Sequence, residues 1–587
     1  MEASRTFDRM IGRWLGALAF AWAVCGCGQT ESNGDGSGSG GSAGESGGSS
    51  NGGSSNGGSS NGGGSGGTSG EPDPDFFVDQ IRQTAIDKLD LLFVVDNSTS
   101  MADKQALLGS AVPALVERLL NPDCVQLDDG QVVARAAAGP DGCPEDFDVE
   151  FSPLDDIHIG VITSSLGGHG GDFCSNATQA SWNETQNDRA HLLPTVRPDL
   201  NLPMDDAAGF LAWDPSTTTL EELKANFAEH VLGAGEVGCG YEAPLEAWYR
   251  FLIDPSPPQD MLVVDNVAVP AQDTNGIIVD TTVLAQREAF LRPDSIVAVV
   301  MLTDENDCSV VDGGIGWLTA AATVNGSAFV MPPATTACDS NPNDQCCRSC
   351  GLAGEVSGCP PVDSDANCAS PRPSGEDALS LRCHNQKQRF GFDLLYPVER
   401  YVAGLRDPLV YDTQRCDVDG DCPLVQNPLF DARGAGNPRD PSLIFLAGIV
   451  GVPWQDIATE DSLGAPDVLE YMTAPELDSN GRWDVILGDP EAENPEDSAA
   501  LPQDPLMREQ PDPRSGMHPV TNEAVAPETS TDPGANSING HEFVNTDNGD
   551  LQYACIFPLA EARDCTDAAV NACDCREEDL AKNRPLC

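Results

Sequence analysis

Basic residues are scarce in this chain of 587 residues. Lysine and arginine together number 31, against 93 aspartates and glutamates, which gives a formal net charge of -62. Because such a charge repels phosphates, we expect no nucleic-acid partner. Two catalytic patterns are also missing. The seven histidines form no H-E-x-x-H pattern, and no predicted strand leads into a G-x-S-x-G nucleophile elbow. The sequence therefore favours a protein that is not an enzyme.

The N-terminus has the features of an export signal. Three arginines accompany an apolar stretch from Trp14 to Val24, which is far too short to span a bilayer. The stretch ends in Val24-Cys25-Gly26-Cys27, which resembles a bacterial lipobox. The resemblance implies that residues 1–27 are a lipoprotein signal and that Cys27 carries the lipid. We then expect a lipid-anchored protein of the bacterial cell envelope, at the outer membrane or cell surface. Ordinary signal cleavage and an uncleaved anchor are the alternatives.

A low-complexity segment follows the signal. Residues 28–75 consist largely of glycine, serine, asparagine and threonine. Such a composition cannot bury a core, so the segment is predicted to be a disordered tether. A flexible chain of this length spans roughly 35–40 Å. That reach suits a spacer that holds a folded domain away from a membrane.

Cysteine usage agrees with export. The chain has 21 cysteines, concentrated at 338–383, 416–422 and 555–587. In an exported protein this predicts a disulfide framework, although the pairing cannot be read from the sequence. Removing Cys25 and Cys27 leaves an odd number, which implies a free thiol or an intermolecular bond. Zinc is the rival interpretation at Cys346-Cys347-x-x-Cys350 and Cys573-x-Cys575.

Apolar runs that suit buried strands alternate with stretches of helical spacing. The predicted strands are 90–96, 157–163, 296–303 and 443–450, and the predicted helices are 106–120, 219–231, 397–405 and one from about Ala243. This alternation predicts an α/β domain over 85–459, with a doubly wound, mostly parallel sheet flanked by helices. Insertions at 121–147 and 308–384, the second rich in cysteine, interrupt it. Residues 460–587 are predicted to be loop-rich, with one short strand from Trp483 to Leu487.

Two clusters of acidic and hydroxyl side chains directly follow predicted strands. Asp96-Asn97-Ser98-Thr99-Ser100 follows the first strand, and Asp304-Glu305-Asn306-Asp307 follows the strongest one. Ligands of open parallel sheets bind outside the carboxyl ends of the strands. A D-x-S-x-S turn can aim one carboxylate and two hydroxyls at a single point, and these oxygen ligands suit a hard divalent cation.

These segments resemble the first and third motifs of the metal-ion-dependent adhesion site of von Willebrand factor A domains. The first reads Phe-Val-Val-Asp-Asn-Ser-Thr-Ser-Met and the third Met-Leu-Thr-Asp-Glu. The resemblance covers roughly 89–452 without the insertions. It implies that Asp96, Ser98, Ser100 and Asp304 surround a divalent cation, with Mg²⁺ favoured over Ca²⁺ or Mn²⁺. It also implies that an acidic group of a partner completes the coordination.

The second motif of that family departs from the expected pattern. The loop and helix of Gly238-Cys239-Gly240-Tyr241-Glu242-Ala243-Pro244 match, but the expected threonine is absent. Glu242 carries the only hard oxygen at nearly that place. A carboxylate in place of a hydroxyl would make the site more negative, tightening metal binding and weakening attraction for an acidic partner. The alternative is a degenerate site that holds metal loosely.

The functional hypothesis is a surface-displayed, metal-dependent binding module for an extracellular protein or glycan. Its rival is a structural cell-envelope protein with a vestigial metal site, in which the disulfide-stabilised insertions make the contacts. A further acidic loop, Asp417-x-Asp419-Gly420-Asp421, lies between Cys416 and Cys422. It resembles a short calcium loop without the distal glutamate of an EF-hand, and a disulfide-closed acidic turn is the other interpretation.

Overall fold

The structure analysed is a computed structural model of the whole chain. It describes residues 88–98, 101–128, 131–136, 142–150, 153–154, 156–175, 186–197, 202, 209–214, 216–235, 237–352, 354, 356–373, 377–416, 420–433, 438–464, 470–489, 501–511, 514–525 and 551. The predicted signal with Cys27, the predicted tether and the cysteines beyond Cys422 lie outside the described residues.

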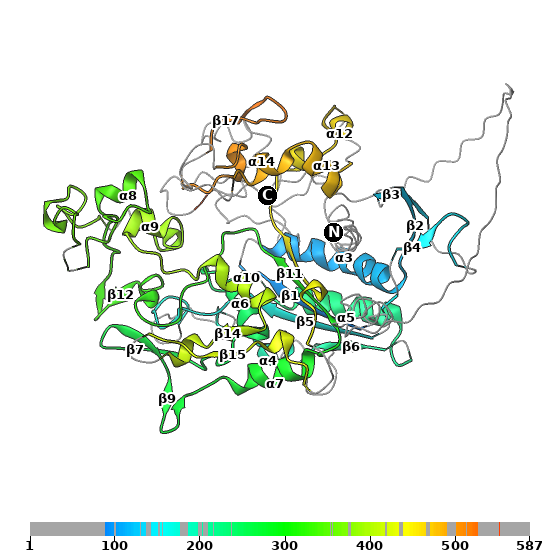
Figure 1. The fold of residues 1–587 in the computed structure, drawn as a ribbon, viewed down its shortest axis with the longest axis horizontal. Helices are drawn as coiled ribbons and strands as arrows, with labels where there is room; N and C mark the ends of the chain where they lie inside the picture. The colour runs from blue at the N-terminus through cyan, green and yellow to red at the C-terminus, as the bar shows by residue number, and fades with distance from the viewer. Residues whose placement is uncertain are drawn as a thin grey trace, which may run out of the picture. The chain divides into compact units, whose positions relative to one another are not determined.

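A five-stranded sheet forms the centre of the fold, with the order β16-β11-β1-β5-β6 (Figure 1). Its strands are β1 (Lys88–Val95), β5 (Asp156–Thr163), β6 (Leu211–Trp213), β11 (Ile296–Leu302) and β16 (Ile444–Ile449). The first, second, fourth and fifth of these are parallel, and β6 pairs antiparallel with β5. The predicted α/β class and the four predicted strands are therefore confirmed. The antiparallel edge strand was not predicted.

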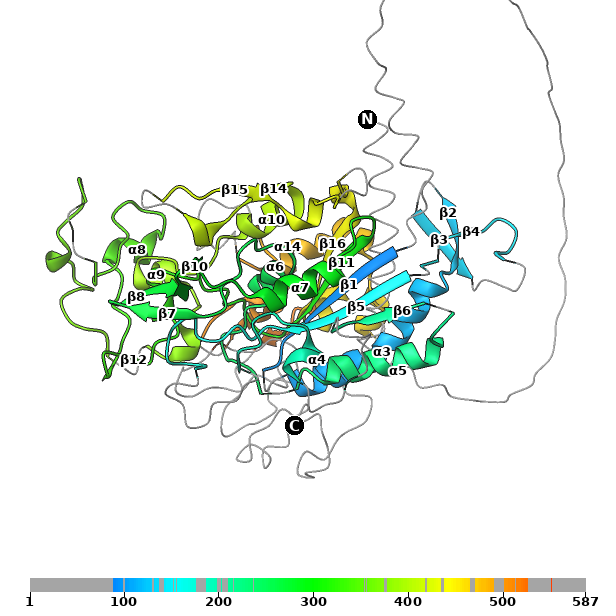
Figure 2. The same cartoon turned by 90° about the horizontal axis from the view of Figure 1, so that it is seen from below.

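Helices cover both faces of this sheet (Figure 2). The helix α3 (Ala102–Leu120) lies beside α5 (Leu220–Leu232), while α6 (Pro244–Leu252) lies beside α7 (Thr281–Phe290). Successive residues of β1 point to opposite faces of the sheet, so alternate residues pack against the helices on each face. One core cluster contains Leu89, Leu91 and Phe93 with α3 and α5, and the other contains Leu92 and Val94 with α6 and α7.

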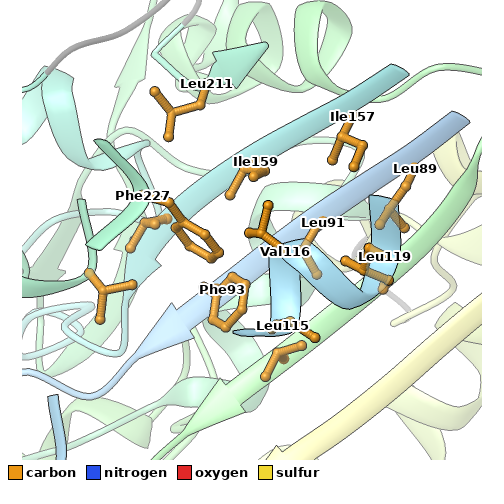
Figure 3. Close-up of a cluster of buried hydrophobic side chains, with 14 of the residues drawn as sticks. Leu89, Leu91, Phe93, Leu115, Val116, Leu119, Ile157, Ile159, Leu211 and Phe227 are labelled. Carbon is orange, nitrogen blue, oxygen red and sulfur yellow. The ribbon is translucent and has the colours of Figure 1, made fainter. Parts of the chain in front are cut away.

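The first of these clusters explains why β1 is so strongly apolar. Figure 3 shows Leu91 and Phe93 of β1 among the side chains of the neighbouring helices. The ring of Phe93 meets that of Phe227 edge-on, with centroids 4.9 Å apart. Within β1 only Lys88 is partly exposed. Burial on both faces accounts for the unbroken apolar run, since neither face of the strand contacts water.

The remaining elements lie in the insertions, connections and C-terminal part. Within the described residues they are β2 (Cys124–Asp128), β3 (Gln131–Ala136), β4 (Asp148–Val149), α4 (Leu193–Val196), β7 (Met261–Val264), β8 (Val267–Pro270), β9 (Gln272–Asp273), β10 (Gly276–Ile277), β12 (Thr323–Val324), β13 (Ser327–Ala328), α8 (Thr336–Ser340), α9 (Gln386–Phe390), α10 (Val398–Arg406), β14 (Leu409–Tyr411), β15 (Leu424–Gln426), α11 (Trp454–Ile457), α12 (Glu460–Gly464), α13 (Ala474–Ser479), α14 (Arg482–Ile486), β17 (Gly516–Met517) and β18 (Ala524–Val525). None of the described helices is both long and apolar enough to cross a membrane.

Within the part of the chain that the structure describes, seven disulfides cross-link the domain and its insertions. They join Cys124–Cys143, Cys174–Cys239, Cys308–Cys383, Cys338–Cys347, Cys346–Cys359, Cys350–Cys368 and Cys416–Cys422. The predicted disulfide framework is thus confirmed for these fourteen cysteines. Cys346, Cys347 and Cys350 go to three different partners, which excludes the zinc interpretation of that cluster. The pair Cys573 and Cys575 lies outside the described residues.

The prediction of a strand from Trp483 to Leu487 was wrong. This segment forms the short helix α14. Val485 and Ile486 are buried, whereas Trp483 and Leu487 are exposed. Two adjacent buried residues flanked by exposed ones do not alternate between two faces, as a half-buried strand requires, but they fit one side of a helical turn.

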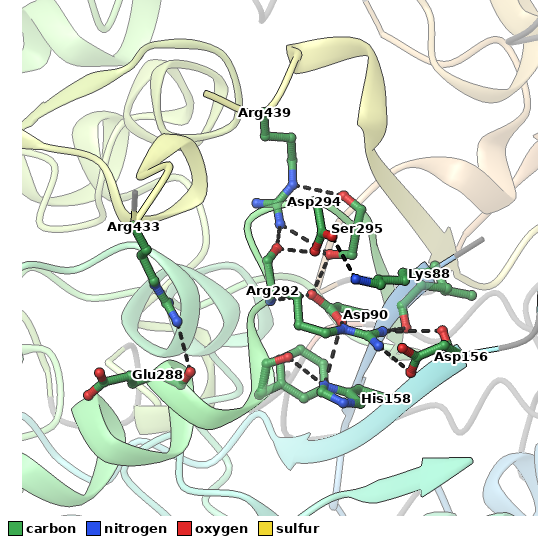
Figure 4. A network of polar contacts seen from close by, with 12 residues as sticks. Lys88, Asp90, Asp156, His158, Glu288, Arg292, Asp294, Ser295, Arg433 and Arg439 are labelled. Carbon is green, nitrogen blue, oxygen red and sulfur yellow. Dashed lines mark hydrogen bonds and ion pairs between the residues drawn. The ribbon is translucent and has the colours of Figure 1, made fainter. Parts of the chain in front are cut away.

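A polar network closes the amino-terminal end of the sheet (Figure 4). Asp90 of β1 is fully buried and accepts hydrogen bonds from Arg292 Nε at 2.7 Å, the Arg292 amide at 2.7 Å and Ser295 Oγ at 2.5 Å. Arg292 also pairs with Asp156 of β5, and Arg439 Nε donates to the carbonyl of Ser295 at 2.9 Å. One buried carboxylate therefore links β1 to the turn before β11.

Candidate functional site

The predicted metal residues gather at the carboxyl edge of the central strands. The last paired residues of β1 and β11 are Val95 and Leu302. Since the two strands are parallel and in register, the segments that follow them leave the sheet side by side. The amide of Asp96 donates to the carbonyl of Leu302 at 2.9 Å. The sheet thus places the first and third motifs against one another.

Asp96 is held rigidly at this edge. Its side chain is fully buried. One carboxylate oxygen accepts from the Ser98 amide at 2.8 Å, and the other accepts from Thr303 Oγ1 at 2.8 Å. Burial and the charge of Asp304 raise the pKa of Asp96 to about 6, so its carboxylate is mostly ionised at pH 7. Two hydrogen bonds from neighbouring loops fix the orientation of a charged group that water does not reach.

The loop before α6 is tied to the same edge. Ser165, which follows β5, donates to Asn97 Oδ1 at 2.7 Å and accepts from the Cys239 amide at 2.8 Å. Gly238 lies so close that a Cβ atom there would stand 2.4 Å from Asn97 Oδ1. Only glycine allows this approach. Three loops that are distant in the sequence therefore meet through Asn97, Ser165 and Cys239.

Glu242 lies at the end of this loop, directly before α6. Its backbone is fixed by an isolated bridge to Ser165 and by a hydrogen bond from the Cys308 amide to its carbonyl at 2.7 Å. The side chain is buried, and among the described residues no hydrogen bond reaches its Oε1. Burial, then Glu305 and Asp96, raise the pKa of Glu242 well above its ordinary value. The carboxylates of Glu305 and Asp96 therefore lie close enough to Glu242 to disfavour its charged form.

Lys104 is the cation of the site. This residue lies in the first turn of α3, and its Nζ is 3.2 Å from Asp304 Oδ2. Side chains of both partners are almost completely buried. The ammonium therefore balances one of the carboxylates that surround the edge. The sequence analysis did not identify Lys104, Thr303 or Glu305 as members of the site.

The sequence-predicted residues divide into three groups. Asp304 lies near enough to Asp96, and Asp96 near enough to Glu242, to act electrostatically. Ser98 is buried, and its amide donates to the carboxylate of Asp96. Ser100 lies outside the described residues, as do Asp417 and Asp419 of the possible calcium loop. The Cys416–Cys422 disulfide that closes that loop is present, with Asp421 inside it.

Comparisons with known proteins give no family for this chain. No protein-family model, curated protein or solved structure matches it. The arrangement of the site is therefore interpreted from its own chemistry.

A second candidate site lies in the C-terminal part and was missed by the sequence analysis. Asp456, Asp504 and His518 are all completely buried, and one potential ligand atom from each lies within 4.8 Å of the others. Burial and Asp504 raise the pKa of Asp456 to about 8. This Asp-Asp-His group could hold a metal ion. No local pattern reveals it, because the three residues come from three separate segments of a region predicted only as loop-rich.

Proposed function

We propose that this chain is a divalent-metal-dependent binding module of the von Willebrand A type, displayed at the bacterial cell envelope. The observation that carries the metal site is the buried carboxylate of Glu242. The charges of Glu305 and Asp96 act on it, its side chain hydrogen-bonds that of Glu305, and its Oε1 receives no hydrogen bond from the described residues. Burying several carboxylates together is costly unless cations neutralise them. A divalent ion supplies that neutralisation.

The ligand set suits a hard cation. Asp96, Asp304 and Glu242 offer carboxylate oxygens, and Ser98 offers a hydroxyl. Mg²⁺ accepts a few carboxylates and completes its shell with water, while Mn²⁺ and Ca²⁺ also prefer oxygen. The resemblance to adhesion sites then suggests that the metal binds a ligand. An acidic group of an extracellular protein or glycan would replace a water and complete the coordination. The lipobox ending at Cys27 supports display at the membrane.

Divalent-metal binding is the first property to measure. Titration calorimetry of the chelator-treated protein with Mg²⁺, Mn²⁺ and Ca²⁺ is expected to show saturable binding that Asp96→Asn weakens at least about a hundredfold. That estimate follows because even the outer partners of metal ligands contribute 10–100-fold. Asp294→Asn is the matched control, since its carboxylate is exposed and pairs with Lys88 in the Figure 4 network. Equal affinities of Asp96→Asn and wild type would refute the site.

Lys104 favours a second candidate function, the structural envelope protein with a vestigial site. Its ammonium already lies 3.2 Å from Asp304, where a metal would gain from the same carboxylate. If the ammonium replaces the metal permanently, the edge is a closed salt bridge and the insertions make the contacts. If the ammonium of Lys104 neutralises Asp304 only while no metal is bound, the metal competes with Lys104 for that carboxylate.

Replacing Lys104 with methionine separates these two functions. Methionine keeps most of the buried aliphatic stem and removes the charge. For a working metal site we expect Mg²⁺ or Mn²⁺ affinity to rise at least about tenfold, because the competing cation is lost. For a vestigial site we expect no binding in either protein and a less stable variant, since Asp304 loses its counter-charge. Calorimetry and thermal denaturation of the two proteins, with and without chelator, give both readings.

A further inference from the structure

We propose that Asp456, Asp504 and His518 form a structural zinc site, separate from the edge of the central sheet. Asp456 comes from α11, Asp504 directly precedes a 3₁₀ turn at Pro505–Met507, and His518 directly follows β17. All three side chains are completely excluded from solvent. The proposal does not depend on the function proposed above.

The spacing of the three groups carries the inference. His518 Nε2 lies 3.4 Å from Asp504 Oδ2 and 3.6 Å from Asp456 Oδ1. Ligand atoms bound tetrahedrally to zinc at about 2.0–2.1 Å from the ion are roughly 3.3–3.4 Å apart. The two separations from His518 are therefore close to those that a shared ion would set, and the carboxylate oxygens of Asp456 and Asp504 lie within 4.8 Å of each other.

Other histidines of the same chain show what a direct contact looks like. His191 Nε2 lies 2.7 Å from Asp280 Oδ2, and His169 Nδ1 lies 2.8 Å from Asp312 Oδ1. Those pairs are hydrogen bonds. At His518 Nε2, at both oxygens of Asp456 and at Asp504 Oδ2, the described residues place no donor in hydrogen-bonding geometry, and the carboxylates of Asp456 and Asp504 can bond each other only through a shared proton. Buried polar atoms in native proteins are nearly always satisfied, and a bound ion would satisfy all four atoms, whereas a shared proton would satisfy only one oxygen of each carboxylate.

The surroundings hold two of these side chains in place. Asp504 Oδ1 accepts from the Leu506 amide at 2.9 Å, which leaves Oδ2 directed to the centre. His518 Nδ1 accepts long hydrogen bonds from the amides of Val520 and Thr521, at 3.2 and 3.3 Å. A neutral imidazole arranged in this way carries its proton on Nε2. Zinc binding at Nε2 would move that proton to Nδ1, and the amides of Val520 and Thr521 would then have to turn away from it. A metal-free group sharing protons is the competing arrangement.

The position of the site in the chain explains what a metal would do there. The seven described disulfides all lie between Cys124 and Cys422, and no cysteine occurs between Cys422 and Cys555. The C-terminal segments have short helices and small hairpins. Regions that cannot build a large core commonly rely on disulfides or a structural metal. Two carboxylates and an imidazole are ligands that zinc accepts, complete burial suits a structural ion, and a water would complete the four-coordinate shell.

Metal analysis of the full chain, purified without chelators, tests the inference. We expect about one equivalent of zinc that survives gel filtration and a lower melting temperature after a strong chelator, restored by Zn²⁺ but not by Mg²⁺. Co²⁺ added to the stripped protein is expected to give the visible absorption of a four-coordinate site, which Zn²⁺ then abolishes. These measurements need no variant. They would overturn the inference if the stripped protein bound neither Zn²⁺ nor Co²⁺, leaving the proton-sharing group.

Substitutions of His518 and Asp504 test whether these residues bind the metal. His518→Gln and Asp504→Asn are expected to lose the zinc and the Co²⁺ absorption. His191→Gln, which breaks another, partly buried His–Asp contact, is expected to keep both. Retention of stoichiometric zinc by His518→Gln would contradict the assignment. Asp96→Asn should also keep the zinc, so that failure of the edge site and failure of this one are distinguishable.

Discussion

Replacing Asp90 with alanine is expected to lower the free energy of unfolding by about 3–5 kcal/mol. The carboxylate is fully buried and accepts three hydrogen bonds, two from Arg292 and one from Ser295. Removing one partner of a buried ion pair leaves the other charge without compensation, and this accounts for the size of the loss. Arg292 would keep its contact with Asp156, but that carboxylate is half exposed. Denaturant unfolding followed by circular dichroism measures the change.

The matched control is Asp294→Ala in the same network. Asp294 pairs with Lys88 at 2.6 Å, but the two side chains are 57% and 32% exposed. Exposed ion pairs contribute about 0–1 kcal/mol, so this variant should stay close to wild type. A loss below about 1 kcal/mol in Asp90→Ala as well would mean that the network in Figure 4 does not stabilise the sheet.

Asp90 and Asp96 show how far the sequence could be interpreted. They bracket the same apolar strand, and the sequence placed both at its ends. The order of residues indicated that Asp96 lies at the carboxyl edge, where ligands bind, and the parallel pairing with β11 agrees. It did not indicate that Asp90 is a structural counter-ion, because its partner Arg292 is 202 residues away. Strands and motifs are local patterns, whereas ion pairs between loops depend on the completed fold.

The same distinction explains the candidate sites. Glu242 was identified because it occupies a place within a local loop-and-helix pattern. Lys104 was missed because its position on α3 has meaning only once β11 brings Asp304 beside it. The Asp456, Asp504 and His518 group was beyond reach for the same reason, since no spacing rule links its members. The helix at Arg482–Ile486 was mistaken for a strand because a run of five residues is too short to reveal its period.

Removing the Cys174–Cys239 disulfide as a pair of alanines is expected to destabilise the protein by about 4 kcal/mol. The bond closes a loop with a sequence separation of 65, and the entropy that a cross-link removes from the unfolded chain grows with loop length. Both cysteines are buried beside Tyr241, so alanine avoids placing a new hydroxyl in the core. Cys239 also donates its amide to Ser165, which contacts Asn97. We therefore expect weaker divalent-metal binding together with lower stability.

A second disulfide provides the comparison that isolates the loop-length effect. Cys416–Cys422 has a sequence separation of only 6, for which the same relation gives roughly 2 kcal/mol, and it lies far along the chain from Glu242. Its alanine pair should lose about half as much stability and keep metal affinity unchanged. Denaturant unfolding and calorimetry on the three proteins, without reductant, decide the matter. If neither alanine pair changes metal affinity, the loop before α6 is held at the edge of the sheet by Gly238, Ser165 and Asn97 rather than by its disulfide.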